Sequence, residues 1–382
     1  MDNDKPRGEG MQAPVGANAS EGVKAPRGVN ARLPESWTIT ATAGWPARQE
    51  PRRVPAVAVV VAAYGVERYI GECIESVRGQ STDDWELIVV DDGSTDETGR
   101  IADRYAASDP RIRVIHRENG GLSEARNTGL AAVTAPFVTI LDGDDVLHPD
   151  YLSYLLSLQK GRRDRISCVG HFRFDDRDAN PFDNGGGPYG EVRTLPQEEA
   201  QEEMLYQKGV DHSAWGKLYP RHAIPAGIYT PGIGYEDLDS FYRILPEVKE
   251  VVVAPTRLYG YRRNPGSYLS VFTPRRADVL DVAERMERHM EGNPRLLAAA
   301  RSRLLSAYFN IYTLMAAARM RDAALERRCL DGIERLGDEV LHNRNTRLKN
   351  KAGIFIYQLC GGATIRLLAR TQAWLAGLTK RR

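Results

Sequence analysis

Acidic residues gather at three places in the sequence where they could hold a cation or move a proton. The first, Asp142-Gly143-Asp144-Asp145, puts three carboxylates within four residues, and such groups repel one another unless a cation or hydrogen bonds offset the charge. A hard divalent cation, Mg²⁺ or Mn²⁺, accepts carboxylate oxygens and leaves coordination positions for phosphate. An ordinary surface turn is the alternative, because Asp and Gly are common turn residues.

The second acidic place is Asp91-Asp92, followed by Ser94 and Glu97. A carboxylate here could accept the ring N–H of a uracil-like base. The alternative is helix capping, because Ser94 and Glu97 have the S-x-x-E spacing of a capping box, which predicts a helix beginning there.

The third is Glu236-Asp237, at the start of a predicted helix. An acidic pair in a first helical turn commonly only complements the helix dipole. The functional hypothesis makes Asp237 the general base that takes the proton of an incoming hydroxyl. Upstream, Trp215 could stack on a sugar ring, with a core tryptophan as the alternative.

One basic residue follows a glycine-rich entry to a helix. Backbone N–H groups after Gly120-Gly121 favour a bound phosphate, and Arg126 can add a charge-assisted bond to it. An ordinary glycine turn with a solvated arginine is the alternative interpretation.

Alternating strands and helices must position these residues. Continuous apolar runs such as 56–63 predict strands covered on both faces, and helical spacing of apolar residues predicts the segments between them. Strands are predicted at 56–63, 85–90, 111–116 and 136–141, with helices at 66–77, 94–105, 123–133 and from Pro149. This alternation predicts a mostly parallel sheet, in which ligands bind beyond the carboxyl ends of the strands. Tyr64, Asp92 and the Asp142–Asp145 cluster all fall at such ends.

The second half of the chain is predicted with less regularity. Strands are expected at 166–172, 251–254 and 258–262, a mobile loop at 175–191, helices at 196–208 and 235–245, and mainly helix over 275–342.

Composition excludes several classes of protein. The 382 residues carry a net charge of +1, which gives no general attraction to nucleic acid. Four scattered cysteines predict buried thiols in a reducing compartment. We see no secretory signal and no uninterrupted apolar run of about 18 residues, so we expect a cytoplasmic protein. Residues 1–53 are predicted to be disordered because they lack apolar periodicity.

The last forty residues differ from the rest. From Asn343 to Arg382 there are nine Lys or Arg and no Asp or Glu, interleaved with apolar groups. This pattern is typical of a helix in the interface of an anionic membrane. A basic helix packed on the rest of the chain is the alternative.

Several segments together resemble the family 2 glycosyltransferases of the GT-A fold. They occur in the family's order across about residues 55–270, as A-A-Y-G (62–65), DDGSTDET (91–98), ENGGLSEARNTG (118–129), LDGDD…HPDYL (141–152), WGKLY (215–219), GYEDLDSFYRI (234–244) and YRRNPGS (261–267). The resemblance implies an α/β GT-A domain with a C-terminal helical extension. The predicted divisions are a disordered segment (1–53), the catalytic domain (54–270), the helical extension (271–345) and a basic amphipathic tail (346–382).

The resemblance also assigns roles to residues. It implies that Ala62, Tyr64 and Asp92 hold the nucleoside, and we add Arg126 and Asp142 as further nucleotide contacts. Asp142 and Asp144 would form the D-x-D motif that holds Mg²⁺ or Mn²⁺.

It further implies that Asp237 is the catalytic base, and we add Trp215 and Glu236 as sugar contacts. The family usually has Pro and Asn beside the tyrosine, where this chain has Ala62 and Gly65. We therefore expect backbone contacts to the nucleoside there.

The expected activity is inverting transfer of a sugar from a nucleoside-diphosphate donor, expected to be UDP-linked, to a hydroxyl acceptor in cell-surface polysaccharide or glycoconjugate synthesis. The acceptor could be a saccharide, a lipid-linked sugar or a polymer. The alternatives are a non-catalytic nucleotide-sugar-binding protein and a nucleotidyltransferase. On the glycosyltransferase hypothesis, Asp92, Asp144 and Asp237 should line one cleft.

Overall fold

The computed structural model describes residues 54–178, 180–186, 190–263 and 273–379, which belong to one compact unit. The predicted disordered segment 1–53 lies outside the described residues, as do positions 264–267 of the last family-like motif and the basic residues 380–382.

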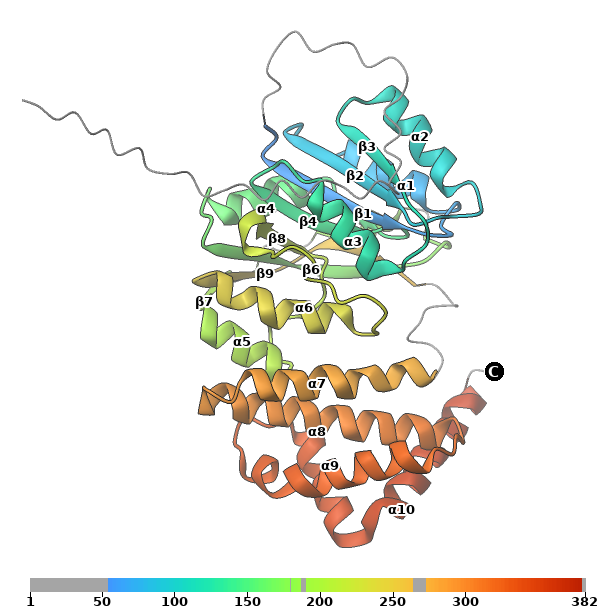
Figure 1. Ribbon diagram of the computed structural model, residues 1–382, viewed down its shortest axis with the longest axis vertical. Coiled ribbons are helices and arrows are strands. Elements are labelled where there is room, and N and C mark those ends of the chain that lie inside the picture. Colours follow the sequence, from blue (N-terminus) through green and yellow to red (C-terminus); the bar gives the residue numbers. More distant parts are fainter. Residues whose placement is uncertain (1–53, 179, 187–189, 264–272, 380–382) are drawn as a thin grey trace, which may run out of the picture. The chain divides into compact units, whose positions relative to one another are not determined.

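A mixed sheet forms the centre of the described unit (Figure 1). Its strand order is β3-β2-β1-β4-β8-β6-β9-β5, and β7 also pairs with β9. The strands are β1 (Val57–Ala63), β2 (Trp85–Asp91), β3 (Ile112–His116), β4 (Phe137–Asp142), β5 (Val146–Leu147), β6 (Arg165–Phe174), β7 (Arg193–Pro196), β8 (Lys217–Pro220) and β9 (Glu250–Arg262). The first four are mutually parallel, as predicted, so their carboxyl ends meet at one edge.

Helices connect these strands and then continue alone towards the C-terminus. They are α1 (Ile70–Arg78), α2 (Thr98–Ser108), α3 (Leu122–Ala131), α4 (Tyr151–Gln159), α5 (Gln197–Leu205), α6 (Glu236–Ile244), α7 (Asp278–His289), α8 (Pro294–Ala317), α9 (Ala323–His342) and α10 (Leu348–Thr379). Asn293 and Asp322 begin α8 and α9 because their side chains accept hydrogen bonds from backbone N–H groups of the first turn.

Strand β1 is buried on both faces, as its continuous apolar run predicts. Val57, Val59 and Val61 pack with α1 on one face, while Ala58 and Val60 pack with α3 on the other. Successive side chains of a strand point to opposite faces, so one run of residues supports two layers of the core.

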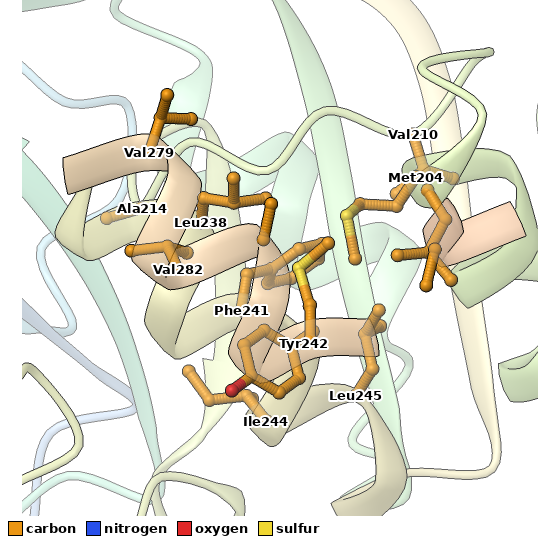
Figure 2. Close-up of a cluster of buried hydrophobic side chains, with 14 of the residues drawn as sticks. Met204, Val210, Ala214, Leu238, Phe241, Tyr242, Ile244, Leu245, Val279 and Val282 are labelled. Atoms are coloured by element: carbon orange, nitrogen blue, oxygen red, sulfur yellow. The ribbon is translucent and has the colours of Figure 1, made fainter. Parts of the chain in front are cut away.

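The C-terminal helices share a hydrophobic core with the sheet. Phe241 of α6 lies in one cluster with Met204 of α5 and Val282 of α7 (Figure 2). The same cluster continues through Leu304 of α8 to Ile354 of α10. The predicted helical extension therefore packs continuously onto the sheet layer, while the domain boundaries themselves stay predictions.

Three local predictions are wrong. Ser94 and Glu97 make no capping box, because Ser94 Oγ accepts from the N–H of Gly65 and α2 begins at Thr98 without a side-chain cap. Segments 251–254 and 258–262 are one strand, β9, whose pairing with β6 shifts register near Gly170. Cys360 is exposed, whereas the other three cysteines are buried.

The segment predicted as a mobile loop holds a short 3₁₀ helix, Pro181–Asn184. Positions 179 and 187–189 of it lie outside the described residues. The basic tail forms α10, which bends at Gly361, where φ is 72°. Within the described residues, the part Leu348–Gln372 is long and apolar enough, by length and composition only, to cross a membrane.

Candidate functional site

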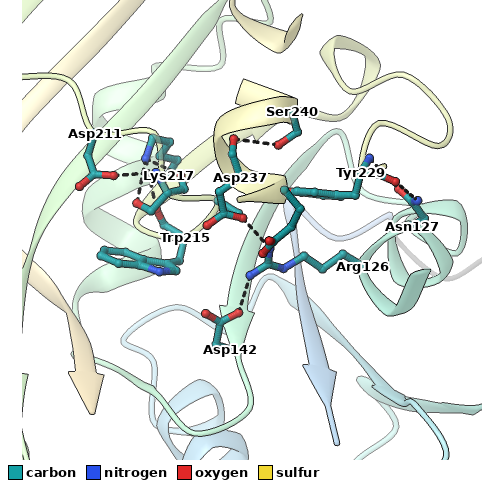
Figure 3. A network of polar contacts seen from close by, with 12 residues as sticks. Arg126, Asn127, Asp142, Asp211, Trp215, Lys217, Tyr229, Asp237 and Ser240 are labelled. Carbon is teal, nitrogen blue, oxygen red and sulfur yellow. Dashed lines mark hydrogen bonds and ion pairs between the residues drawn. The ribbon is translucent and has the colours of Figure 1, made fainter. Parts of the chain in front are cut away.

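A cleft of about 660 Å³ opens where the sheet edge meets the start of α6. Its lining comes from the start of α3, the end of β4, strand β6, the segment before β8 and the turn that leads into α6. Among the lining residues are Arg126, Asp142, His171, Trp215, Glu236 and Asp237. Five residues selected from the sequence thus meet in one cleft (Figure 3).

Arg126 is the centre of this cleft. Its Nη1 donates to Asp237 Oδ1 at 2.5 Å and to Glu236 Oε1 at 3.0 Å, while its Nη2 donates to Asp142 Oδ1 at 2.8 Å (Figure 3). Only 1% of the Arg126 side chain is exposed. Three carboxylates from β4 and α6 therefore share one buried cation, and negative charge remains in excess.

Close packing of α3 on the sheet brings Arg126 to this place. Gly129, three residues further along α3, lies so close to Val60 of β1 that an added Cβ would collide with it. The Asn127 side chain donates to the carbonyl of Tyr229 and accepts from its N–H, at 2.7 and 3.1 Å (Figure 3). These contacts tie α3 to the segment that precedes α6.

The turn into α6 aims the acidic pair at the cleft. Tyr235, just before Glu236, has φ 61°, a left-handed conformation that is uncommon for a residue with a large side chain. Its carbonyl accepts from the N–H of Asp239 in the first turn, and its hydroxyl accepts from Arg276 Nε at 3.1 Å. Such strained residues are found at functional sites when the surrounding contacts hold them.

Burial changes the acidity of Glu236. Desolvation raises the pKa of the Glu236 carboxyl to about 7, and repulsion from Asp237 adds to this effect. A carboxyl group with a pKa near 7 can both take and give a proton at neutral pH.

A second buried network holds the Asp142–Asp145 turn, and sequence reasoning assigned it no role. Asp145 is 2% exposed, and its carboxylate accepts from Tyr259 Oη at 2.7 Å and from the N–H of Arg262 at 2.8 Å. Tyr259 Oη also accepts from the N–H of Asp142, and Arg262 Nε donates to the carbonyl of Asp144. Strand β9 therefore fixes the backbone that carries the D-x-D carboxylates. Tyr259 and Arg262 lie over 100 residues from Asp145, so no local sequence signal could have revealed this network.

Asp92 organises the glycine-rich entry to α3. It is 2% exposed, and its carboxylate accepts from the N–H groups of Gly120 and Gly121, at 2.7 Å for the latter. The N–H groups of Gly120 and Gly121 are thus occupied by Asp92, and binding of phosphate by the N–H groups that follow them stays a prediction. Contact between Asp92 and a nucleoside stays a prediction.

The expectation that Asp92, Asp144 and Asp237 line one cleft is only partly met. Asp237 lines it, but Asp92 and Asp144 are not among its lining residues. Asp92 is linked to the cleft indirectly. Its carboxylate accepts hydrogen bonds from Gly120 and Gly121, and these two glycines line the cleft.

Ala62 and Tyr64 also lie outside the cleft lining. Ala62 is buried, and Tyr64, 57% exposed, projects beyond the end of β1. Their contact with a nucleoside stays a prediction.

Trp215 belongs to an aromatic wall of the cleft. Its ring stacks on Tyr259, with centroids 4.5 Å apart and planes 13° apart, and it meets His171 edge to face at 5.2 Å. The Trp215 side chain is half-buried, so one part of it packs into the core while another faces the cleft. Trp215 therefore fits both interpretations, as a core residue and as a residue that faces the cleft.

The donor set suits a hard divalent cation that brings further ligands with it. Within the described ranges, no group of three or more His, Cys, Asp or Glu side chains is arranged to hold a metal ion. Asp142, which lines the cleft beside Arg126, and Asp144, two residues further along the chain, offer two carboxylates. Mg²⁺ commonly binds one or two carboxylates and completes its shell with water and substrate phosphates, which fits this pair.

Comparison with known proteins finds a family match over part of the chain. The profile of "Glycosyl transferase family 2" matches residues 58–224. This match covers less than half of the chain. The matched segment includes the ends of β1, β2 and β4 and the residue Arg126, whereas Glu236 and Asp237 lie beyond it.

Three related proteins match parts of this chain over 136 to 222 residues. The glycosyltransferase EpsH of Bacillus subtilis is 36% identical over 175 residues, which are 45% of this chain and 49% of EpsH. EpsJ of the same organism is 32% identical over 222 residues, 57% of this chain and 64% of EpsJ. Chondroitin synthase of Escherichia coli is 38% identical over 136 residues, 35% of this chain and 20% of the synthase. The chain thus spans about half of EpsH and under two thirds of EpsJ.

A solved structure resembles more of the chain. TarS of S. aureus, residues 1–349 in complex with UDP-GlcNAc, has a TM-score of 0.59 at 16% identity, covering 84% of this chain and 92% of TarS 1–349. This likeness confirms the predicted GT-A fold with helices after the sheet.

Proposed function

We propose that this chain transfers a sugar from a nucleoside-diphosphate donor, UDP-linked, to a hydroxyl acceptor with inversion, in the synthesis of a cell-surface polysaccharide or glycoconjugate. One observation carries the proposal: the D-x-D carboxylate Asp142 and the acidic pair Glu236-Asp237 meet on Arg126 in one cleft. The family 2 match and the relationship to a chondroitin synthase support transfer of a sugar to a growing glycan. The acceptor class is a saccharide, a lipid-linked sugar or a polymer.

In the proposed reaction, Asp237 takes the proton of the acceptor hydroxyl. The acceptor oxygen forms a bond to the anomeric carbon as the bond from that carbon to the leaving diphosphate breaks, and the electron pair stays on the diphosphate. Attack opposite the leaving group inverts the configuration. Arg126 orients Asp237 for this step, because its Nη1 holds Oδ1 at 2.5 Å.

The donor's diphosphate needs compensation for its negative charge. Asp142 and Asp144 would hold Mg²⁺ or Mn²⁺, which supplies that compensation when bound. Trp215 would pack against a sugar ring from the aromatic wall, and Tyr64 with Asp92 would hold the nucleoside. TarS was solved in complex with UDP-GlcNAc, but at 16% identity the donor proposed here rests on the residues of the cleft.

The test replaces Asp237 by Asn, which keeps its size and removes its basicity. We expect donor transfer to fall by about 10²–10⁴-fold, while donor binding with Mn²⁺, followed by calorimetry, is retained. Asp83→Asn, at an exposed acidic residue just before the amino end of β2, is the matched control. Normal turnover by the Asp237 variant would falsify its assignment as the base.

Glu236 is a second candidate for the base, favoured by its pKa of about 7. Glu236→Gln tests this second hypothesis. A loss of rate in the Glu236 variant alone, with donor binding retained, would make Glu236 the base, and an equal loss in both variants would mean that the two carboxylates act together. A protein that binds the donor but shows no transfer with any acceptor would be a nucleotide-sugar-binding protein. Release of pyrophosphate from a nucleoside triphosphate would instead indicate a nucleotidyltransferase.

A further inference from the structure

The outward face of α10 carries an unusual concentration of exposed apolar side chains. Nine large hydrophobic residues are exposed in the described part of the chain, and five lie on this one helix. Those five are Leu348 (84% exposed), Phe355 (58%), Leu359 (67%), Leu367 (65%) and Leu368 (51%). Leu348, Phe355 and Leu359 succeed one another at intervals of seven and four residues, so they lie on one side of the helix.

The inward face of α10 is packed and hydrogen-bonded to its neighbours. Ile354 is fully buried, and Ile365 is 7% exposed. Tyr312 of α8 donates to the carbonyl of Gly362 at 2.9 Å, and Gln358 donates to Asp338 of α9 at 2.8 Å. A helix crossing a bilayer would have to break these contacts, although the length and composition of α10 would allow a span.

Charge is distributed unequally between α10 with its flanks and the rest of the chain. Residues 343–382 hold nine basic and no acidic residues, so residues 1–342 hold 43 basic and 51 acidic residues. Arg344, Lys349 and Arg370 are exposed beside the apolar face. An exposed apolar stripe flanked by cations is complementary to anionic lipid headgroups over acyl chains.

A second copy of this chain fits the same face less well. A two-fold symmetric contact would place α10 against α10. The basic residues of both copies would then meet without acidic partners from this segment, and like charges repel.

We propose that α10 docks this protein on an anionic membrane, lying in the interface with its outward apolar side chains among the headgroups and upper acyl chains. The inward face keeps its contacts with α8 and α9, so the docked protein is peripheral. This would place residues 58–224, which match the family 2 profile, at a membrane surface. The docking is independent of the proposed catalytic step.

The start of α10 is tied to a segment that leads to the cleft. Asn343 and Arg347, just before α10, donate to Tyr206 and Gln207 at 2.7 and 2.5 Å. The chain runs from Gln207 within a few residues to Asp211, which lines the cleft.

The test is sedimentation of the full chain with vesicles of phosphatidylcholine alone or mixed with phosphatidylglycerol. We expect binding only to the anionic vesicles, with an affinity that falls as salt rises. Phe355→Gln and Leu359→Gln should each lower the partition coefficient by about tenfold. Arg344→Gln with Lys349→Gln should weaken binding and flatten its salt dependence. Val192→Gln, at an apolar residue 41% exposed and away from α10, is the matched control and should bind like the wild type.

Four outcomes would overturn the proposal. These are the absence of vesicle binding, equal binding by the α10 variants, retention in the vesicles after an alkaline carbonate wash, and a lipid-free dimer that the Phe355 variant dissociates. The third would indicate a spanning helix and the fourth a self-association surface. Unchanged thermal unfolding and unchanged transfer to a water-soluble acceptor show that a variant is folded, and they keep this test separate from that of the catalytic proposal.

Discussion

The cleft and the outer face of α10 depart from the usual distribution of residues in opposite ways. The cleft buries charge: Arg126, 1% exposed, meets three carboxylates. The α10 face exposes apolar surface: Leu348 and Leu359 are 84% and 67% exposed. Charge inside is stable here because fixed partners surround it, whereas the apolar surface outside has no partner in the described part of this chain. The first arrangement prepares a site, and the second leaves a surface for something else to cover.

Removing Arg126, the buried positive charge of the cleft, should have the largest effect on the free energy of unfolding. Arg126→Ala leaves Asp142, Glu236 and Asp237 close together without a counterion, and loss of one partner of a buried ion pair costs about 3–5 kcal/mol. Urea unfolding of the wild type and the variant measures this loss. Arg113→Ala, which removes a half-exposed partner of Glu86, should cost far less. Equal losses of unfolding free energy in the two variants would mean that the burial of Arg126 does not make its ion pairs more important for stability than the half-exposed pair of Arg113.

Two neighbouring residues of α10 should differ sharply in their effect on stability. Ile354 is fully buried and Phe355 is 58% exposed. Ile354→Ala should lower the unfolding free energy by about 2–5 kcal/mol, and Phe355→Ala should change it by less than about 0.5 kcal/mol. Thermal and urea unfolding without lipid provide the measurement. A large loss for Phe355→Ala would show that its face is already covered in the lipid-free protein.

The network below the D-x-D turn should matter more for metal binding than for stability. Tyr259→Phe removes a hydroxyl that joins Asp145 to the backbone of Asp142, and we expect a stability loss of about 1 kcal/mol. Because residues that orient metal ligands typically change affinity by about 10–100-fold, Mn²⁺ binding by calorimetry should weaken within that range. Tyr312→Phe, which removes a hydroxyl that donates to the carbonyl of Gly362 in α10, is the control. An unchanged Mn²⁺ affinity of the Tyr259→Phe variant would show that this network does not influence metal binding.

The last prediction concerns the dependence of stability on pH at the end of β3. The hydrogen bond to Asp91 raises the pKa of His116 to about 9, and Asp103 adds to this. A raised pKa in the folded state stabilises the protein below the unfolded value of about 6.5, and this contribution disappears as pH rises through about 9. His116→Gln should therefore destabilise the protein more at about pH 6 than at about pH 10. Equal losses at both values would argue against a charged His116.

Strands β1 to β4 and β6 and helices α1 to α4 were predictable because they depend on local apolar spacing, whereas the short strands β5, β7 and β8 were not predicted. Runs such as 56–63 and 85–90 became β1 and β2, and their ends carry the expected acidic residues. The capping box at Ser94 does not form, because the Ser94 hydroxyl accepts a hydrogen bond from the N–H of Gly65, in another part of the chain. The two predicted strands that became β9 are joined by residues 254–256, which lie where the pairing with β6 shifts register between Cys168–Val253 and Gly170–Arg257.

The sequence by itself determined which residue types are available at each strand end and that residues 343–382 form an uninterrupted segment without acidic side chains. Only the tertiary structure decided that Arg126 of α3 would join Asp142 to Asp237, 111 residues from Arg126 along the chain, that Tyr259 and Arg262 would support Asp145, and which face of α10 stays exposed. The physical reason is that local patterns govern backbone conformation, whereas ion pairs, buried hydrogen bonds and exposed faces depend on which distant elements pack together.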